Sequence, residues 1–245
     1  MSEDEAFIRK IVDSPGDDLP RLVYADWLDE RDDPRGAYLR AEVEWAKTRQ
    51  TTGFLVLRLH GLADGLDPVW VARVSRPPEG VCCDHIRFTE CGQRLTPGQA
   101  TAWGTRLGVG FPPEFAAFLI NYNAGQVTPA LPAPPDKPFP FCADLEWGFH
   151  PIGHGFGKVT EFERLHQLSS QGLSGIQARL RAEVVELARV NDNDSLFLGV
   201  GGDRTGKIYH FNGYDYERFH PDGLSNHADS LPRYLATLTA QWVHA

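Results

Sequence analysis

The sequence predicts an α+β protein, in which a small N-terminal helical module precedes a mostly antiparallel sheet flanked by helices. The early part of the chain spaces its apolar residues at helical intervals between short acidic turns. Near the other end, a glycine-rich reversal separates the apolar runs 196–200 and 208–211, as in a β-hairpin. Between the N-terminal module and the hairpin, the predicted elements are two helices, then strands, then another helix. A last helix follows the hairpin. This order favours an α+β domain.

Residues 1–75 are predicted to form the helical module, because their apolar residues recur at helical spacing. The predicted helices span residues 4–12, 19–31, 37–47 and about 54–62. Reversals rich in Asp, Pro and Gly at 13–18 and 32–36 separate the first three. Residues 1–33 carry eleven Asp and Glu against four Lys and Arg, so this module holds most of the net charge of −9.

The module contains a long and specific string of residues. It reads Pro20-Arg-Leu-Val-Tyr-Ala-Asp-Trp-Leu-Asp-Glu-Arg31, then Asp33-Pro-Arg-Gly36 and Tyr38-Leu-Arg40. From residue 4 to about 46 the chain resembles the repeat-companion domain of planctomycete and myxobacterial proteins, which implies an accessory or adaptor role. The candidate functional residues here are Asp26, Asp29, Glu30 and Arg35. A solvated helix face with a capped turn also explains these residues.

Residues 76–94 are predicted to be a linker or domain edge, because Ser75-Arg-Pro-Pro-Glu-Gly80 is rich in Pro and Gly. The segment contains Cys82, Cys83 and Cys91. Structural zinc sites usually present paired cysteines two to four residues apart, and these three do not have that spacing. We therefore expect reduced thiols, and predict neither a metal nor any other cofactor.

Residues 95–245 are predicted to form the second domain. Thr96-Pro-Gly-Gln99 has the residues of a capped helix start, and Gly108 those of a helix end. An apolar stripe predicts a second helix over 111–122, and six prolines predict a surface loop over 129–140. The elements expected after this loop are strands at 144–149 and 152–156, a helix at 175–190, the hairpin, and a terminal helix at 230–242.

The hairpin region also admits a competing interpretation as a nucleotide site. Gly201 to Lys207 spells G-x-x-x-x-G-K, which is most of a phosphate-binding loop. That motif needs a Ser or Thr next and then a helix, whereas Ile208 follows and opens a strand-like run. In the hairpin interpretation, Gly201, Gly202 and Gly206 supply the positive φ angles of a tight reversal. An enzyme acting on a nucleotide or phosphate remains the alternative.

Three short motifs follow one another along the predicted second domain. They are Leu107-Gly-Val-Gly-Phe-Pro-Pro-Glu-Phe-Ala-Ala-Phe-Leu-Ile-Asn-Tyr-Asn-Ala-Gly125, then Phe197-Leu-Gly-Val-Gly-Gly-Asp203 with Ile208-Tyr-His-Phe211, then Ala228-Asp-Ser-Leu-Pro-Arg-Tyr-Leu235. Over about 95–242 the chain resembles the SUKH superfamily, which includes yeast cell-wall-assembly regulators and bacterial toxin-immunity proteins. The resemblance implies a protein-binding domain without a catalytic residue set.

The sequence therefore predicts a non-enzymatic, cytoplasmic protein-binding module of the immunity type, whose partner is a toxin. A scaffold in which the helical module docks and the second domain recruits cargo is an alternative. No basic stripe favours nucleic acid, and no apolar run approaches the length of about 18 residues that a membrane span needs. The oligomeric state is left open. The predicted partner-binding residues are Asp144, Glu146, Trp147, Asp203 and Arg204.

Overall fold

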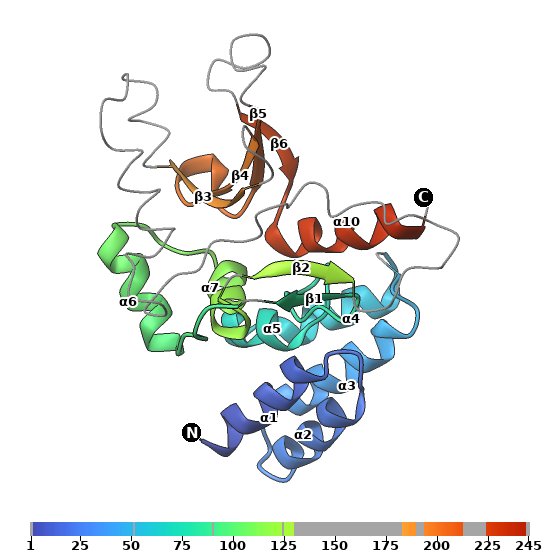
Figure 1. Cartoon of the computed structure of the whole chain (residues 1–245). Coiled ribbons are helices and arrows are strands. Elements are labelled where there is room, and N and C mark those ends of the chain that lie inside the picture. The colour runs from blue at the N-terminus through green and yellow to red at the C-terminus, as the bar shows by residue number, and fades with distance from the viewer. Residues whose placement is uncertain are drawn as a thin grey trace.

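The computed structural model describes residues 2–50, 52–89, 91–123, 125–129, 183–189, 194–212 and 224–243. These ranges form helices together with a two-stranded and a four-stranded antiparallel sheet, so the predicted α+β class is confirmed (Figure 1). The strands predicted at 144–149 and 152–156, and the proline-rich loop after Pro129, lie outside the described residues. Within the described ranges, no helix is both long and apolar enough to cross a bilayer.

The N-terminal module is helical, as the spacing of apolar residues predicts. Its helices are α1 (Glu3–Asp13), α2 (Leu19–Asp29), α3 (Arg35–Ala46) and α4 (Phe54–Ala63). A further helix, α5 (Pro68–Val74), was not predicted. Its start has a local signal, because the Asp67 side chain accepts a hydrogen bond from the Val69 amide at 3.0 Å and Pro68 follows the cap.

Two helices and a small sheet follow α5. In α6 (Pro97–Leu107), Thr96 and Gln99 form the predicted capping box, and Gly108 ends the helix at φ 71°. Helix α7 (Pro113–Asn121) packs against both α5 and α6. Strand β1 (Ile86–Thr89) pairs with β2 (Gln126–Pro129) in antiparallel register. Neither strand was predicted, and β1 falls inside the segment expected to be a linker.

The four-stranded sheet has the order β3–β4–β5–β6. Its strands are β3 (Val184–Arg189), β4 (Asp194–Gly199), β5 (Ile208–Asn212) and β6 (Leu224–Ala228). The predicted hairpin is β4–β5, whereas β6 was not predicted. The predicted terminal helix is α10 (Leu231–Val243), which contacts β6 and α7 (Figure 1).

The prediction of a helix over 175–190 is wrong at its end, because 184–189 is strand β3. The pairing with β4 skips Leu187, since Glu186 lies opposite Phe197 and Ala188 opposite Leu196. This bulge inserts one residue and breaks the alternation of faces. The buried positions then fall at 184, 185, 187 and 188, a spacing that also fits one face of a helix.

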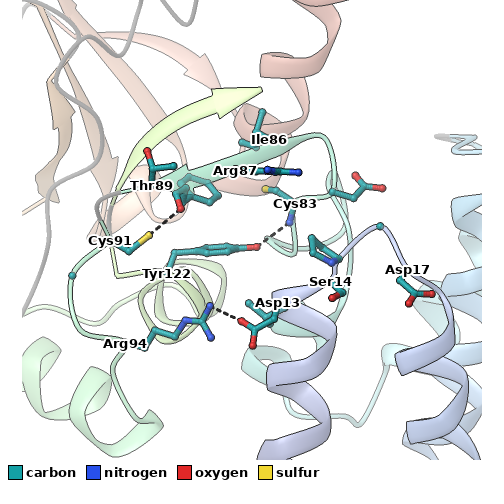
Figure 2. A pocket seen from close by; sticks show the side chains of 16 residues that line it. Asp13, Ser14, Asp17, Cys83, Ile86, Arg87, Thr89, Cys91, Arg94 and Tyr122 are labelled. Carbon is teal, nitrogen blue, oxygen red and sulfur yellow. Dashed lines mark hydrogen bonds and ion pairs between the residues drawn. The ribbon is translucent and has the colours of Figure 1, made fainter. Parts of the chain in front are cut away.

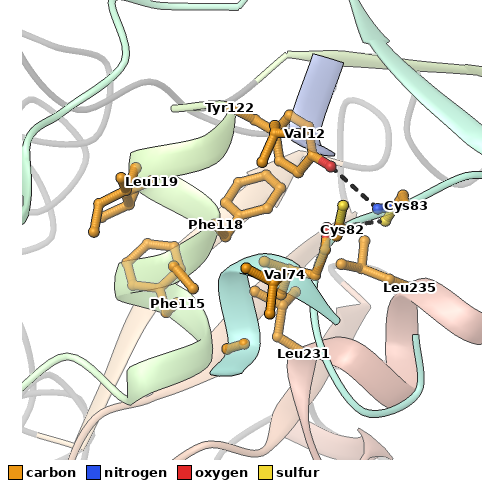
Figure 3. Close-up of a cluster of buried hydrophobic side chains, with 14 of the residues drawn as sticks. Val12, Val74, Cys82, Cys83, Phe115, Phe118, Leu119, Tyr122, Leu231 and Leu235 are labelled. Atoms are coloured by element: carbon orange, nitrogen blue, oxygen red, sulfur yellow. Dashed lines mark hydrogen bonds between the residues drawn. The ribbon is translucent and has the colours of Figure 1, made fainter. Parts of the chain in front are cut away.

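One hydrophobic core extends across the helical module and the second domain. Figure 3 shows Val12 of α1 and Val74 of α5 in the same cluster as Phe118 of α7 and Leu235 of α10. The segment predicted as a linker contributes to this core, because Val81 and Cys82 are fully buried. The two parts of the chain therefore stabilise each other through shared apolar contacts.

Candidate functional site

The hairpin tip carries the two predicted partner-binding residues that the structure describes. The short 3₁₀ turn η2 (Gly202–Arg204) connects β4 to β5, and the Gly199 amide donates to the Lys207 carbonyl at 2.9 Å. Gly202 (φ 57°) and Gly206 (φ 82°) have the expected positive φ angles. The same expectation was wrong for Gly201, which is extended at φ −148°. A strand follows Lys207, so the near-match to a phosphate loop lacks a helix N-terminus.

The hairpin tip is held in one conformation by contacts on its inner side. A Cβ atom on Gly199 would lie 1.7 Å from the backbone oxygen of Arg204, so only glycine fits there. The Arg204 guanidinium pairs with Glu183 at 3.2 Å and lies 5.0 Å from the centre of the Tyr209 ring. Asp203 is exposed on the same turn. The turn therefore presents one carboxylate to solvent on a fixed backbone.

The other predicted partner-binding residues, Asp144, Glu146 and Trp147, lie outside the described residues.

A buried ion network lies beneath the string that resembles the repeat-companion domain. Arg21 and Glu42 are fully buried and pair at 3.1 Å, and Glu42 also pairs with Arg76 at 2.8 Å. Arg21 donates to the carbonyls of Pro15 and Val74 at 2.9 and 3.0 Å. Charges buried to this extent need such partners. Arg21 therefore fastens α2 to the end of α5, which is a structural role.

The acidic residues on the outer side of α2 are also engaged with basic neighbours. Asp26 and Asp29 both pair with Arg40 of α3, at 2.7 and 2.5 Å. Glu30 lies 3.7 Å from Arg31 and is largely exposed. Exposed pairs of this kind contribute about 0–1 kcal/mol each. They fit the solvated helix face that the sequence offered as one explanation.

A cavity of about 660 Å³ lies between the α1–α2 turn and β1 (Figure 2). Asp13 and Arg94 pair across it at 2.8 Å, although they are 81 residues apart in sequence. Tyr122 forms part of the wall, and its hydroxyl accepts a hydrogen bond from the Cys83 amide at 3.1 Å. No local signal in the sequence predicts this cavity, because its walls come from distant segments. Its lining also includes Asp17, Asp84, Arg87, Thr89 and Cys91.

Four titratable groups of this cavity, Cys83, Asp84, Cys91 and Tyr122, have pKa values that are shifted by their surroundings. Burial raises the pKa values of Cys83, Cys91 and Tyr122, so all three stay protonated. Burial also acts to raise the pKa of Asp84, but the hydrogen bond from His85 and the charge of Arg49 outweigh it and lower that pKa to about 2.

The cysteines that were considered as metal ligands are arranged otherwise. Cys82 and Cys83 are buried, and Arg21 donates to the Cys82 sulfur at 3.3 Å. In the part of the chain that the structure describes, no three His, Cys, Asp or Glu side chains are grouped to hold a metal ion.

Comparison with known proteins identifies no family for this chain. Neither a scan against protein-family models nor a search of curated proteins finds a match for the chain.

Proposed function

We propose that this chain is a non-enzymatic protein-binding module of the immunity type, which neutralises a toxin by binding to it. The observation that carries the proposal is the fixed hairpin tip, where Gly199 and Arg204 hold the turn and Asp203 faces solvent. A recognition loop that is already in its bound conformation loses little conformational entropy when a partner binds. The resemblance to SUKH domains, which bind proteins, supports the same function.

The proposal includes a cytoplasmic location. Cys82 and Cys83 are free, buried thiols, which fits a reducing compartment. The competing function, nucleotide binding, would use Lys207, but that residue is followed directly by strand β5. Binding of Mg-ATP to the purified chain would support this competing function.

Site-specific photo-crosslinking tests the proposal. A photo-reactive amino acid replaces Asp203 in one variant and Lys10, an exposed residue of α1, in a control. Both variants are expressed with the products of the neighbouring genes. We expect a crosslinked protein adduct from position 203 only, and we expect excess wild-type chain to suppress it.

Growth of the same cells gives the functional readout. The wild-type chain should relieve growth inhibition by the crosslinked partner, whereas Asp203→Lys should relieve it less, because the substitution reverses the charge of the exposed tip. Equal adducts from positions 203 and 10, or turnover of Mg-ATP in place of any adduct, would contradict the proposal.

A further inference from the structure

A second cavity, of about 630 Å³, is lined by residues of α1, α5, α6 and α7 and of the turn before α3. Part of its lining, here called the apolar wall, comes from four helices. It contains Ile8, Val69, Trp70, Ala100, Ala116 and Ile120. Charged residues, some of them on the same helices, form most of the rest, here called the charged wall. Such a cavity is within the volume range of pockets that enclose a small molecule or a large side chain.

The charged wall carries more negative than positive groups. Its four carboxylates belong to Asp4, Glu5, Asp33 and Asp67, and its two guanidinium groups to Arg35 and Arg73. With all six ionised, the cavity has a charge of −2. This excess favours a cationic occupant over an anionic one.

The two arginines already use their donors on neighbouring carboxylates. Arg35 pairs with Asp33 at 2.7 Å and with Asp4 at 3.1 Å. Arg73 holds Glu5 with both terminal nitrogens, at 2.9 and 2.8 Å. An anion would have to displace these bidentate pairs, which are among the stronger hydrogen bonds in proteins. The cavity therefore offers an incoming group acceptors rather than donors.

Asp33 and Glu5 keep their charge at neutral pH. The hydrogen bonds from Arg35 lower the pKa of Asp33, and burial of Glu5 is outweighed by Arg73, so the pKa of Glu5 is lowered too. The exposed side chain of Asp67 accepts a hydrogen bond from the Val69 amide. Each carboxylate has about four lone-pair positions. A donor with a positive charge can therefore be accepted at this wall.

We propose that this cavity binds a lysine or arginine side chain of the protein partner, with the cationic head at the acidic wall and the alkyl stem along the apolar wall. The inference rests on the proposed function, because it assigns a chemical feature to the partner. Long basic side chains combine these two properties, a charged end and an apolar stem. The net charge, together with the pairs that Arg35 and Arg73 already form with carboxylates, favours a basic side chain over an acidic or neutral one.

Titration with matched synthetic peptides tests the inference. The probe is acetyl-Gly-Arg-Gly-amide, and the control replaces arginine with citrulline, which has nearly the same shape without the charge. The indole N–H signal of Trp70, which lines the cavity, reports binding by NMR. We expect the arginine peptide to shift this signal in a saturable, salt-sensitive manner, and the citrulline peptide to leave it unchanged.

A pair of variants separates the cavity from general electrostatics. Asp67→Asn removes one charge from the wall but keeps a good helix cap, whereas Asp64→Asn removes the same charge from an exposed residue outside it. Asp67→Asn should weaken binding about two- to five-fold, as expected for one partly solvated charge. Asp64→Asn should leave the affinity within about two-fold.

Any one of three results with the peptides and variants would overturn the inference, and a fourth concerns a free cation. The three are equal binding of the arginine and citrulline peptides, equal effects of the two variants, and no shift of the Trp70 signal with the arginine peptide. Butylguanidine serves as a free cation, and binding of butylguanidine without binding of the peptide would exclude a partner side chain. The peptides need no toxin, so a negative result here leaves the crosslinking at position 203 unaffected.

Discussion

Replacing Glu42 with glutamine would show how much the buried ion network contributes to stability. Glu42 is fully buried and pairs with Arg21 at 3.1 Å and Arg76 at 2.8 Å. Glutamine has almost the same size and still accepts a hydrogen bond, but it removes the negative charge that both guanidinium groups face. Two buried cations would then lie in the same region, with Asp18 and Asp84 as the remaining carboxylate partners of Arg76.

The expected cost follows from the burial of these groups. Removing one partner of a buried ion pair typically destabilises a protein by about 3–5 kcal/mol. The retained amide and the other carboxylates place Glu42→Gln at the lower end, about 3 kcal/mol. A chain of this size should then melt about 10 °C lower. The loss is a large part of the free energy of unfolding, which is about 5–15 kcal/mol for most domains.

Urea unfolding, followed by tryptophan fluorescence and far-UV circular dichroism, measures this cost. The control is Glu44→Gln on the same helix, where Glu44 pairs with Arg58 at 2.7 Å and both side chains are about half exposed. The control should cost less than about 1 kcal/mol. If Glu42→Gln costs no more than Glu44→Gln, the network does not have the buried character described above.

Three further predictions concern the hairpin, acid stability and the shared core. Gly199→Ala should destabilise the chain by about 3 kcal/mol, because the added Cβ would overlap the Arg204 carbonyl. The control Gly61→Ala, which has open space on α4, should stabilise the chain by up to about 1 kcal/mol. Thermal melts compare the two variants. The pKa of Asp84 falls from 3.8 to about 2 on folding, so its stabilisation, on the order of 2 kcal/mol, is present above pH 4 and lost as the pH falls towards 2. Urea titrations across that range should show this loss, and Asp84→Asn should reduce it. A fragment of residues 76–245 should bind a hydrophobic dye and unfold without cooperativity, whereas a stable, cooperative fragment would show that the second domain folds alone.

The elements that could be predicted are those whose signals lie within a few residues. Thr96 and Gln99 define the start of α6, and Gly108 its end, because caps depend only on neighbouring atoms. The β4–β5 hairpin followed in the same way from its glycines and its flanking apolar runs. Helix α5 had such a signal in Asp67-Pro68, but its seven residues are too few for a clear apolar period.

The remaining elements depend on tertiary contacts. Strand β3 resembles a helix in sequence because the bulge at Leu187 is defined only by pairing with β4. Strands β1 and β6 are short, at four and five residues, and lack a distinctive alternation. Asp203 could be chosen from the sequence because turn tips are exposed. Neither cavity could be, since the pairs Asp13–Arg94 and Glu5–Arg73 join residues that lie 81 and 68 positions apart.

The contacts of Arg21 with residues distant in sequence set the minimum length of a helical module that could be transferred to another protein. Its guanidinium is bonded to the carbonyl of Val74 and to the sulfur of Cys82, which are 53 and 61 residues further along the chain. A recombination event or an engineered fusion that joined residue 46 to a new domain would separate this cation from both acceptors. A graft that retains its fold should therefore extend to about residue 84, nearly twice the length of the region 4–46 that resembles the repeat-companion domain.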